Sequence, residues 1–149
     1  MTISFFEGVV FLALLAGAAL EDWRTGYISD GWSLAAGLFG TVRLFVSGSF
    51  LPLVSAAAVF FFFLCLRCFR CAGEGDGFLA SAAALWMSPV SCAVFLWTAF
   101  VLGGLAGAVF LISGKRKKED RLPFAPFLCI AGGIAYGWGD ALWHLWLAS

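Results

Sequence analysis

The sequence predicts an all-α fold, a polytopic membrane bundle of about six transmembrane helices that forms a single domain over residues 1–149. Apolar residues make up 62% of the chain and charged residues only 12%, and the mean hydropathy is +0.98. Soluble domains contain about 45–50% apolar and about 25% charged residues, so the composition indicates an integral membrane protein embedded in a lipid bilayer. A membrane helix needs about 20 residues, so six spans with short connections use the whole length. The net charge is zero, which gives no reason to expect a nucleic-acid partner.

The first three spans are expected at residues 4–20, 32–46 and 50–71. The first run is interrupted only by Glu7 and has no basic segment before it, so we interpret it as a transmembrane helix and not as a signal peptide. The second run is short and closes at the Ser-Gly-Ser stretch of residues 47–49. Pro52 suits the first turn of the third helix.

The last three spans are expected at residues 78–88, 91–112 and 123–146. The fourth is short and lies between a glycine-rich stretch, residues 72–77, and Ser88-Pro89. Three glycines within five residues oppose helix formation, so we expect the glycine-rich stretch to be a loop. Gly103, Gly104 and Gly107 allow close helix packing in the fifth span, and the tryptophans near residue 146 suit a membrane interface in the sixth.

The basic residues are divided unevenly between the two sides of this bundle. Eight of the nine lie in or beside the connections at 21–31, 67–77 and 114–121. These are Arg24, Arg67, Arg70, Lys115, Arg116, Lys117, Lys118 and Arg121, and only Arg43 falls near the other side. Basic connections face the cytoplasm, so the three connections are predicted inside and both termini outside.

Two acidic segments then meet at the cytoplasmic end. Asp22 follows the first span and Asp76 precedes the fourth. Two carboxylates close together cannot both ionise easily, so one keeps its proton and the pair can activate a water molecule. With one carboxylate as base and the other as acid, this pair predicts the chemistry of an aspartic protease.

Other candidate sites are weaker. Asp140 ends a second Gly-Xaa-Gly-Asp segment, but it lies 19 residues after Arg121 (140 − 121), about 28 Å along a helix, and is expected on the outer face with His144. The sequence therefore offers no histidine triad. The three cysteines at 65, 68 and 71 form a stripe on one helix face without a fourth ligand, so neither a metal nor another cofactor is expected.

Three motifs in order resemble those of the type IV prepilin peptidases, which are membrane aspartic proteases of the GxGD type. Residues 22–30 (DWRTGYISD) resemble the family's Asp-x-Arg-x3-Ile-Pro-Asp/Asn, residues 73–79 (GEGDGFL) its Gly-x-Gly-Asp-x-Lys-Leu, and residues 122–128 (LPFAPFL) its Ile-Pro-Phe-Gly-Pro-Phe-Leu. The resemblance implies that Asp22 and Asp76 are catalytic. The residues that match the motifs around them are Arg24, Asp30, Gly73 and Gly75.

Two departures from these motifs matter. Ser29 stands where the family has proline, and we expect it to loosen the turn after the first aspartate. Phe78 stands where the family has lysine, which removes a cation near the second aspartate. The chain also resembles the compact, peptidase-only form of the family, in which methylation of the new N-terminus is not expected.

The resemblance implies an endopeptidase of the bacterial inner membrane that cleaves the leader peptide of type IV pilin-like or pseudopilin precursors at the cytoplasmic face. It is compatible with a homo-oligomer. Glu21, Glu74, Glu119 and Asp120 are candidates for attracting a basic leader, although solvated loop charge is the favoured role. Two alternatives stay open: a catalytically impaired relative that acts as a membrane assembly factor, and a presenilin-type intramembrane protease.

Overall fold

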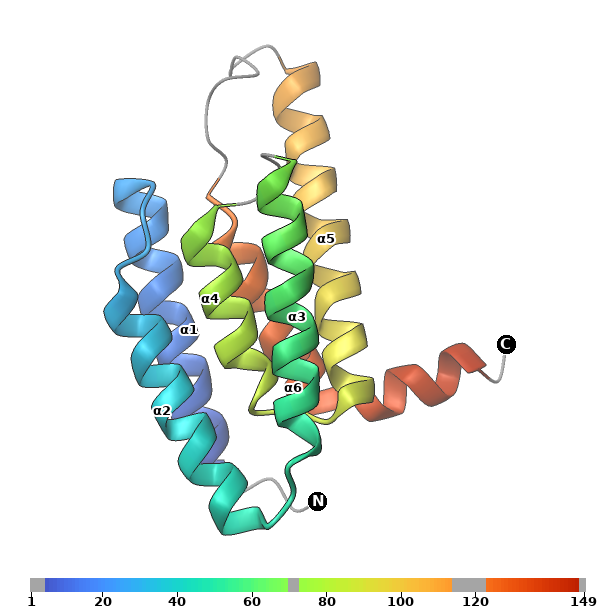
Figure 1. Ribbon diagram of the computed structural model, residues 1–149. Helices are drawn as coiled ribbons and strands as arrows, with labels where there is room; N and C mark the ends of the chain where they lie inside the picture. The colour runs from blue at the N-terminus through green and yellow to red at the C-terminus, as the bar shows by residue number, and fades with distance from the viewer. Residues whose placement is uncertain (1–4, 70–72, 114–122, 148–149) are drawn as a thin grey trace.

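The structure, a computed structural model, describes residues 5–69, 73–113 and 123–147, and these residues form six α-helices without a strand (Figure 1). The helices are α1 (Phe5–Thr25), α2 (Asp30–Ser47), α3 (Leu51–Cys68), α4 (Glu74–Ala84), α5 (Pro89–Ile112) and α6 (Ala125–Leu147). The all-α prediction is confirmed, and each predicted apolar run overlaps one helix. The basic connection at 114–121, Arg70 and Cys71 lie outside the described residues.

Two helix boundaries differ from the sequence prediction in ways that matter for the site. Helix α1 continues five residues beyond the predicted end, to Thr25, whose Oγ1 donates to the Glu21 carbonyl at 2.8 Å. It stops at Gly26, which has a φ of 68°. Helix α4 begins at Glu74, so the prediction of a loop over the glycine-rich stretch is wrong for residues 74–77. Glycine is unfavourable in a helix by about 1 kcal/mol relative to alanine, and the close contacts of Gly75 with Ile28 and of Gly77 with Phe63 offset this cost.

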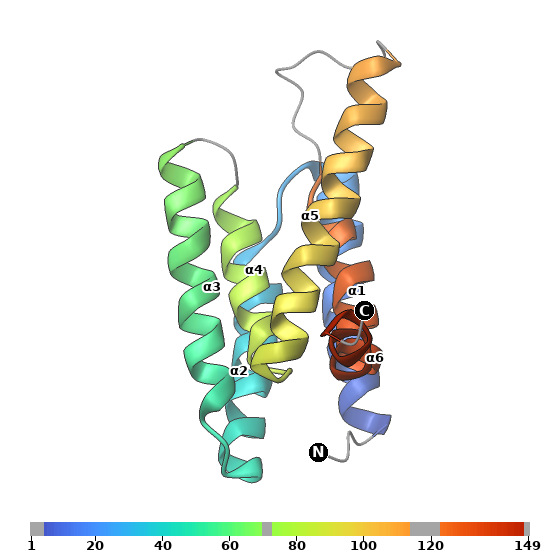
Figure 2. The same cartoon turned by 90° about the vertical axis from the view of Figure 1, so that its right-hand side faces the viewer.

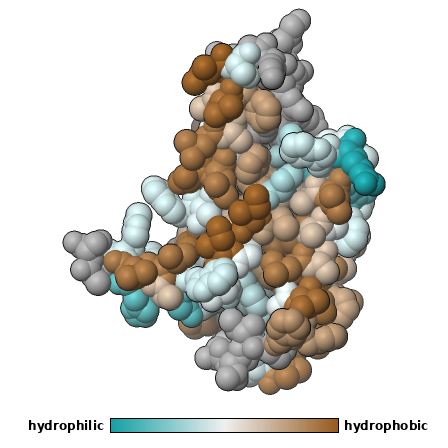
Figure 3. All heavy atoms as spheres, turned by 180° about the vertical axis from the view of Figure 1, so that it is seen from behind, coloured by the Kyte–Doolittle hydropathy of each residue, from teal (hydrophilic) through white to brown (hydrophobic). Residues whose placement is uncertain are grey.

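The described helices that are long and apolar enough to cross a membrane are α3 and α5. Helix α4 has 11 residues and rises only about 16 Å, less than the roughly 30 Å of a hydrocarbon core. Seen from behind, the molecule presents a largely hydrophobic surface, with hydrophilic side chains gathered at a few places (Figure 3). This surface agrees with a bundle whose outer side chains contact lipid.

Helix α4 lies at the centre of the bundle. It packs mainly against α3 and α2, and it also contacts α1 and α6. Helix α6 in turn lies between α1 and α5, behind α4 in the first view (Figures 1 and 2). The side chains that α4 buries are mostly small: Leu79, Ala80, Ala82, Ala83 and Ala84. Small residues let several helix backbones approach one short helix at once.

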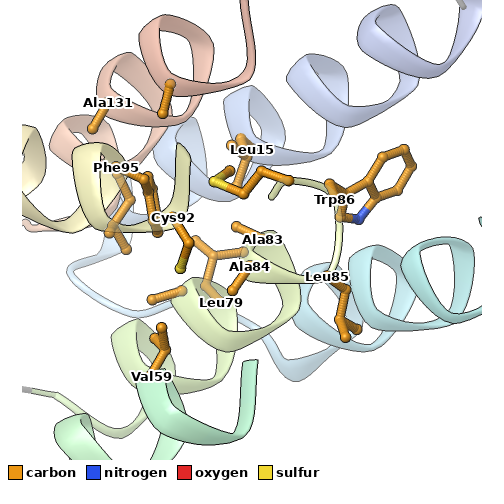
Figure 4. Close-up of a cluster of buried hydrophobic side chains, with 14 of the residues drawn as sticks. Leu15, Val59, Leu79, Ala83, Ala84, Leu85, Trp86, Cys92, Phe95 and Ala131 are labelled. Atoms are coloured by element: carbon orange, nitrogen blue, oxygen red, sulfur yellow. The ribbon is translucent and has the colours of Figure 1, made fainter. Parts of the chain in front are cut away.

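The hydrophobic core continues from α4 into the turn that follows it (Figure 4). The Trp86 indole N–H donates to the Ala36 carbonyl of α2 at 2.9 Å, in a buried position. The Phe11 ring of α1 contacts the rings of Trp86 and Tyr136, with centroid distances of 5.3 and 4.9 Å. This cluster joins α1, α2, the α4–α5 turn and α6 at the end of the bundle opposite the start of α4.

Gly40 on α2 provides a test of this packing. A Cβ at Gly40 would lie 2.8 Å from the Leu85 Cβ and 2.9 Å from the Trp86 Nε1, whereas a Cβ at Gly104 would meet no atom within 4 Å. We expect Gly40→Ala to lower the free energy of unfolding by about 1–3 kcal/mol through overpacking. Gly104→Ala, the matched control, should leave it within about 1 kcal/mol of the parent. Denaturation in detergent micelles measures both, and equal effects of the two changes would contradict the close contact between α2 and the α4–α5 turn.

Candidate active site

Asp22 is buried in the last turn of α1. Its side chain is 6% exposed, and its Oδ2 accepts a hydrogen bond from the Ala125 backbone N–H at 3.0 Å. The Phe124 backbone N–H contacts the same carboxylate. These donors belong to the start of α6, where the unpaired N–H groups and the helix dipole favour a negative charge. The third sequence motif, residues 122–128, therefore supplies the partner of the first aspartate.

Asp76 lies in the first turn of α4 and is partly buried. Its Oδ2 accepts a hydrogen bond from the Gly73 backbone N–H at 3.3 Å, so the side chain folds back over the start of its own helix. This is the reciprocal bond of a capping box, in which a carboxylate at the third helical position accepts from the residue before the helix. The bond limits the directions in which the Asp76 carboxylate can point.

The glycines around Asp76 permit close contacts. A Cβ at Gly75 would lie 3.2 Å from the Ile28 Cβ, and a Cβ at Gly77 would lie 2.9 Å from the Phe63 Cβ. Gly75 thus rests on the α1–α2 connection, and Gly77 rests on α3. The glycine motif places the first turn of α4 between these two elements, and this turn carries Asp76.

The structure brings Asp22 and Asp76 together, although they are 54 residues apart in the chain (76 − 22). The two carboxylates are close enough to interact electrostatically. Two carboxyl groups that interact in this way hold one proton between them more readily than they both ionise. The arrangement can therefore present a general acid and a general base to one water molecule.

The motif residues Arg24 and Asp30 are not part of this contact. Both are exposed, Arg24 in the last turn of α1 and Asp30 at the first position of α2. Within the described ranges, neither side chain makes a hydrogen bond or an ion pair. They flank the connection that carries Ile28 without touching the two carboxylates.

The departure at Ser29 does not loosen the turn, contrary to the sequence prediction. The Ser29 backbone N–H and Oγ both donate to the Glu21 Oε2, at 3.1 and 2.9 Å. The Ser29 φ of −69° is close to the value that proline imposes. Two hydrogen bonds thus restrain the position that the family motif fills with proline.

The departure at Phe78 packs against α3. The Phe78 ring is 49% exposed and lies 5.6 Å from the Phe60 ring of α3, between centroids. Both rings border a small hollow between α3 and α4. At its rim, Arg67 forms an ion pair with Glu74, which joins the end of α3 to the start of α4.

Asp140 lies at the other end of the bundle. It follows Ala125 by 15 residues on α6 (140 − 125), about 22 Å along the helix. Its Oδ1 accepts hydrogen bonds from the Ser88 and Ser91 hydroxyl groups at 2.7 and 2.8 Å, at the start of α5. Gly139 beside it allows the close approach, because a Cβ there would lie 2.9 Å from the Ser91 Cα. The second Gly-Xaa-Gly-Asp segment is thus a helix-packing contact.

No metal cluster forms among the residues that the structure describes: nowhere do three His, Cys, Asp or Glu side chains gather as ligands. Cys65 and Cys68 are exposed on α3.

Sequence reasoning missed three features that support the aspartates: the Ala125 backbone donor, the Ile28–Gly75 contact and the Glu21–Ser29 hydrogen bonds. The Leu-Pro-Phe-Ala-Pro motif marked the first of these as a special segment without indicating its partner. Ile28 was visible as a motif position. Nothing in the sequence indicated that Glu21, the acidic residue beside Asp22, would contact Ser29.

The comparisons with known proteins agree on one family. The model of the type IV leader peptidase family matches residues 9–112, which include both aspartates. Three relatives are named prepilin leader peptidase/N-methyltransferase. The one from Legionella pneumophila is 32% identical over 85 residues, which cover 56% of this chain and 30% of the relative. The one from Burkholderia pseudomallei strain K96243 is 28% identical over 143 residues (89% of this chain, 46% of the relative), and the one from Bacillus subtilis strain 168 is 27% identical over 153 residues (95% of this chain, 59% of the relative). The chain spans between 30% and 59% of the length of these relatives. No solved structure matches it.

The matched segment and the paired aspartates lead to one conclusion: the chain belongs to the type IV leader peptidase family, a family of membrane aspartic proteases.

Proposed function

We propose that this chain is a membrane aspartic endopeptidase that removes the leader peptide from type IV pilin-like or pseudopilin precursors at the cytoplasmic face of the bacterial inner membrane. The observation that carries the proposal is the meeting of Asp22 and Asp76, which come from two separate family motifs. The names of the relatives, prepilin leader peptidase/N-methyltransferase, support the same substrate class.

The reaction needs one proton on the pair and one water molecule beside it. The ionised carboxylate takes a proton from the water, whose oxygen attacks the carbonyl carbon of the scissile peptide. The protonated carboxyl group gives its proton to the carbonyl oxygen, which forms a tetrahedral intermediate. Collapse of this intermediate breaks the C–N bond: a hydroxyl group of the intermediate returns its proton to the second carboxylate as the carbonyl re-forms, and the leaving amine takes up the proton that came from the water. The pair then again holds one proton.

The backbone contacts suit these roles. The Ala125 N–H holds the Asp22 carboxylate from one side, and the Gly73 N–H holds the Asp76 carboxylate from another. Such donors belong to the main chain and need no side-chain rearrangement during the reaction, so they restrict the orientation of the reacting groups.

The position of the pair also suits a precursor with a leader and an apolar helix. Asp22 lies in the last turn of α1 and Asp76 in the first turn of α4, so both carboxylates lie at one end of the bundle. A precursor helix can lie along the apolar surface of the bundle, with its leader junction at the level of the aspartates. The exposed rings of Phe60 and Phe78 extend that apolar surface toward Asp76.

No observation favours the two alternatives. The impaired-relative hypothesis rested on Ser29 and Phe78, yet Ser29 restrains the connection through Glu21 and Phe78 packs on Phe60. A presenilin-type protease needs aspartates well inside long helices, whereas Asp22 and Asp76 occupy terminal turns.

The two aspartates provide the central test. Asp22→Asn and Asp76→Asn should each reduce precursor cleavage by about 10²–10⁴-fold, because each removes a group that takes or gives a proton. The double variant should be hardly worse than either single one, since the two groups act as a unit. Cleavage of a leader-bearing precursor by membranes that contain each variant measures this.

Asp140→Asn is the matched control for that test. It changes the other Gly-Xaa-Gly-Asp segment, where the remaining side-chain oxygen can still accept from Ser88 and Ser91. Normal cleavage by this variant is expected. If Asp140→Asn were inactive while Asp76→Asn still cleaved, the proposed pair would be wrong.

The Ala125 donor can be removed without removing a side chain from the site. Ala125 is the first residue of α6, where proline fits the helix but lacks an N–H. Ala125→Pro should lower kcat by about tenfold to a hundredfold, because Asp22 loses the bond that fixes its direction. Ala125→Ser keeps the N–H and should stay within about threefold of the parent. Equal losses in both variants, measured on protein with unchanged thermal stability, would show that the N–H has no part in cleavage.

The orientation of the chain can be tested with reporter fusions. Fusions after Ser47, after Ser88 and at Ser149 should report the outer compartment, and a fusion near Gly114 should report the cytoplasm. The expectation follows from the eight-to-one division of basic residues. A cytoplasmic C-terminus would contradict the six-span arrangement.

A further inference from the structure

The Glu21 carboxylate, next to the first aspartate in the chain, is held by the connection between α1 and α2. A single oxygen, Oε2, accepts from both the backbone N–H and the Oγ of Ser29. Ser29 occupies the cap position of α2, where a serine oxygen normally accepts from the first helical N–H groups. Its side chain makes no such cap bond here. The serine is therefore directed toward α1 and not toward its own helix.

This contact restrains the residue that touches the second aspartate motif. Ile28, directly before Ser29, is 4% exposed, and its side chain lies against Gly75. Gly75 in turn directly precedes Asp76 in the first turn of α4. Contacts thus run without a break from Glu21, the residue before Asp22, to Ser29 and from Ile28 to Gly75. Gly75 is the residue before Asp76.

A second contact fixes the other side of the same connection. A Cβ at Gly17 would lie 2.3 Å from the Trp32 ring, so this ring rests directly on the backbone of α1. Ser29 and Trp32 therefore hold the start of α2 on α1 at two points, one turn apart. With both points fixed, the connection has little freedom to move Ile28 away from Gly75.

We propose that Glu21 is a positioning residue of the aspartate pair: by holding Ser29 it keeps Ile28 against Gly75 and so sets where α4 presents Asp76 to Asp22. Its consequence for the cleavage rate rests on the proposed function, whereas its consequence for the structure of the connection does not. Glu21 touches neither the substrate nor the reacting atoms in this scheme.

The competing role for Glu21 is attraction of a basic leader peptide. That role needs only the negative charge, and a lost charge should weaken substrate binding and raise KM. The positioning role needs only an oxygen that accepts two hydrogen bonds. It acts on the geometry of the pair, so its loss should lower kcat and leave KM nearly unchanged.

Two substitutions at Glu21 separate these roles. Glu21→Gln keeps an acceptor oxygen on a side chain of the same length and removes the charge, and we expect kcat and KM within about threefold of the parent. Glu21→Ala removes the acceptor, and we expect kcat to fall by about tenfold to a hundredfold at nearly constant KM. If the Gln and Ala variants showed the same rise in KM, leader attraction would be the role of Glu21.

A substitution at Ser29 gives an independent check. Ser29→Pro removes both donors but fixes φ near the −69° already present, so the connection no longer needs Glu21. In the Ser29→Pro background, Glu21→Ala should therefore cause no more than about a twofold further loss. A full tenfold further loss in that background would contradict the proposal.

Hydrogen exchange of the full chain in detergent micelles tests the structural link without any substrate. Glu21→Ala should speed amide exchange in residues 26–31 and also in residues 74–77, while Glu21→Gln should change neither segment. Faster exchange confined to residues 26–31 would overturn the proposal, because the restraint would then end before α4. A parent chain that cleaves no precursor would contradict the proposed function, and the exchange data would still decide whether Glu21 restrains the start of α4.

Discussion

The hydrogen bond between the Ala125 N–H and the Asp22 carboxylate is the contact on which the site depends. It joins residues 103 positions apart in the chain and links the end of α1 to the start of α6. A carboxylate that is only 6% exposed is costly to bury without a partner, and the first turn of α6 supplies both a donor and a favourable dipole. The aspartate can therefore lie inside the bundle only when the first and last helices are correctly packed. The packing of α1 against α6 therefore forms this end of the fold and the hydrogen bond of Asp22 together.

Helix α4 explains how the second aspartate reaches the first. It is short and buried, and its alanines and glycines let α2, α3, α1 and α6 approach it. Because the helix begins at Glu74, its first turn lies at the same end of the bundle as Asp22. The glycines at 75 and 77 have no side chains to separate this turn from Ile28 and Phe63. Helical stability is lost at these positions, and the close packing that results brings two carboxylates within electrostatic range.

The sequence predicted the parts of this structure that depend on local pattern. Apolar runs predicted six helices, and the order of the spans with the division of basic residues placed Asp22 and Asp76 at the same end of the bundle. The sequence did not predict the helix ends and hydrogen-bond partners that depend on long-range contacts. The end of α1 depends on Thr25 and on the positive φ of Gly26, and the start of α4 depends on neighbours that make glycine favourable in a helix. The partners of Asp22 and Glu21 are a distant backbone N–H and a loop serine, and neither can be recognised before the connection's path is known.

The two Gly-Xaa-Gly-Asp segments show why a local pattern does not assign chemistry. In both, a glycine beside the aspartate permits a close backbone contact, with Ile28 in one case and Ser91 in the other. The difference lies in what surrounds the carboxylate. Asp140 is exposed and accepts two serine hydroxyls, so its negative charge is stabilised and its hydrogen-bonding needs are met. Asp76 is partly buried, accepts a single backbone bond and faces a second carboxylate. Only the environment of Asp76 allows two carboxyl groups to hold one proton between them. Hydrolysis by an aspartate pair requires such a shared proton.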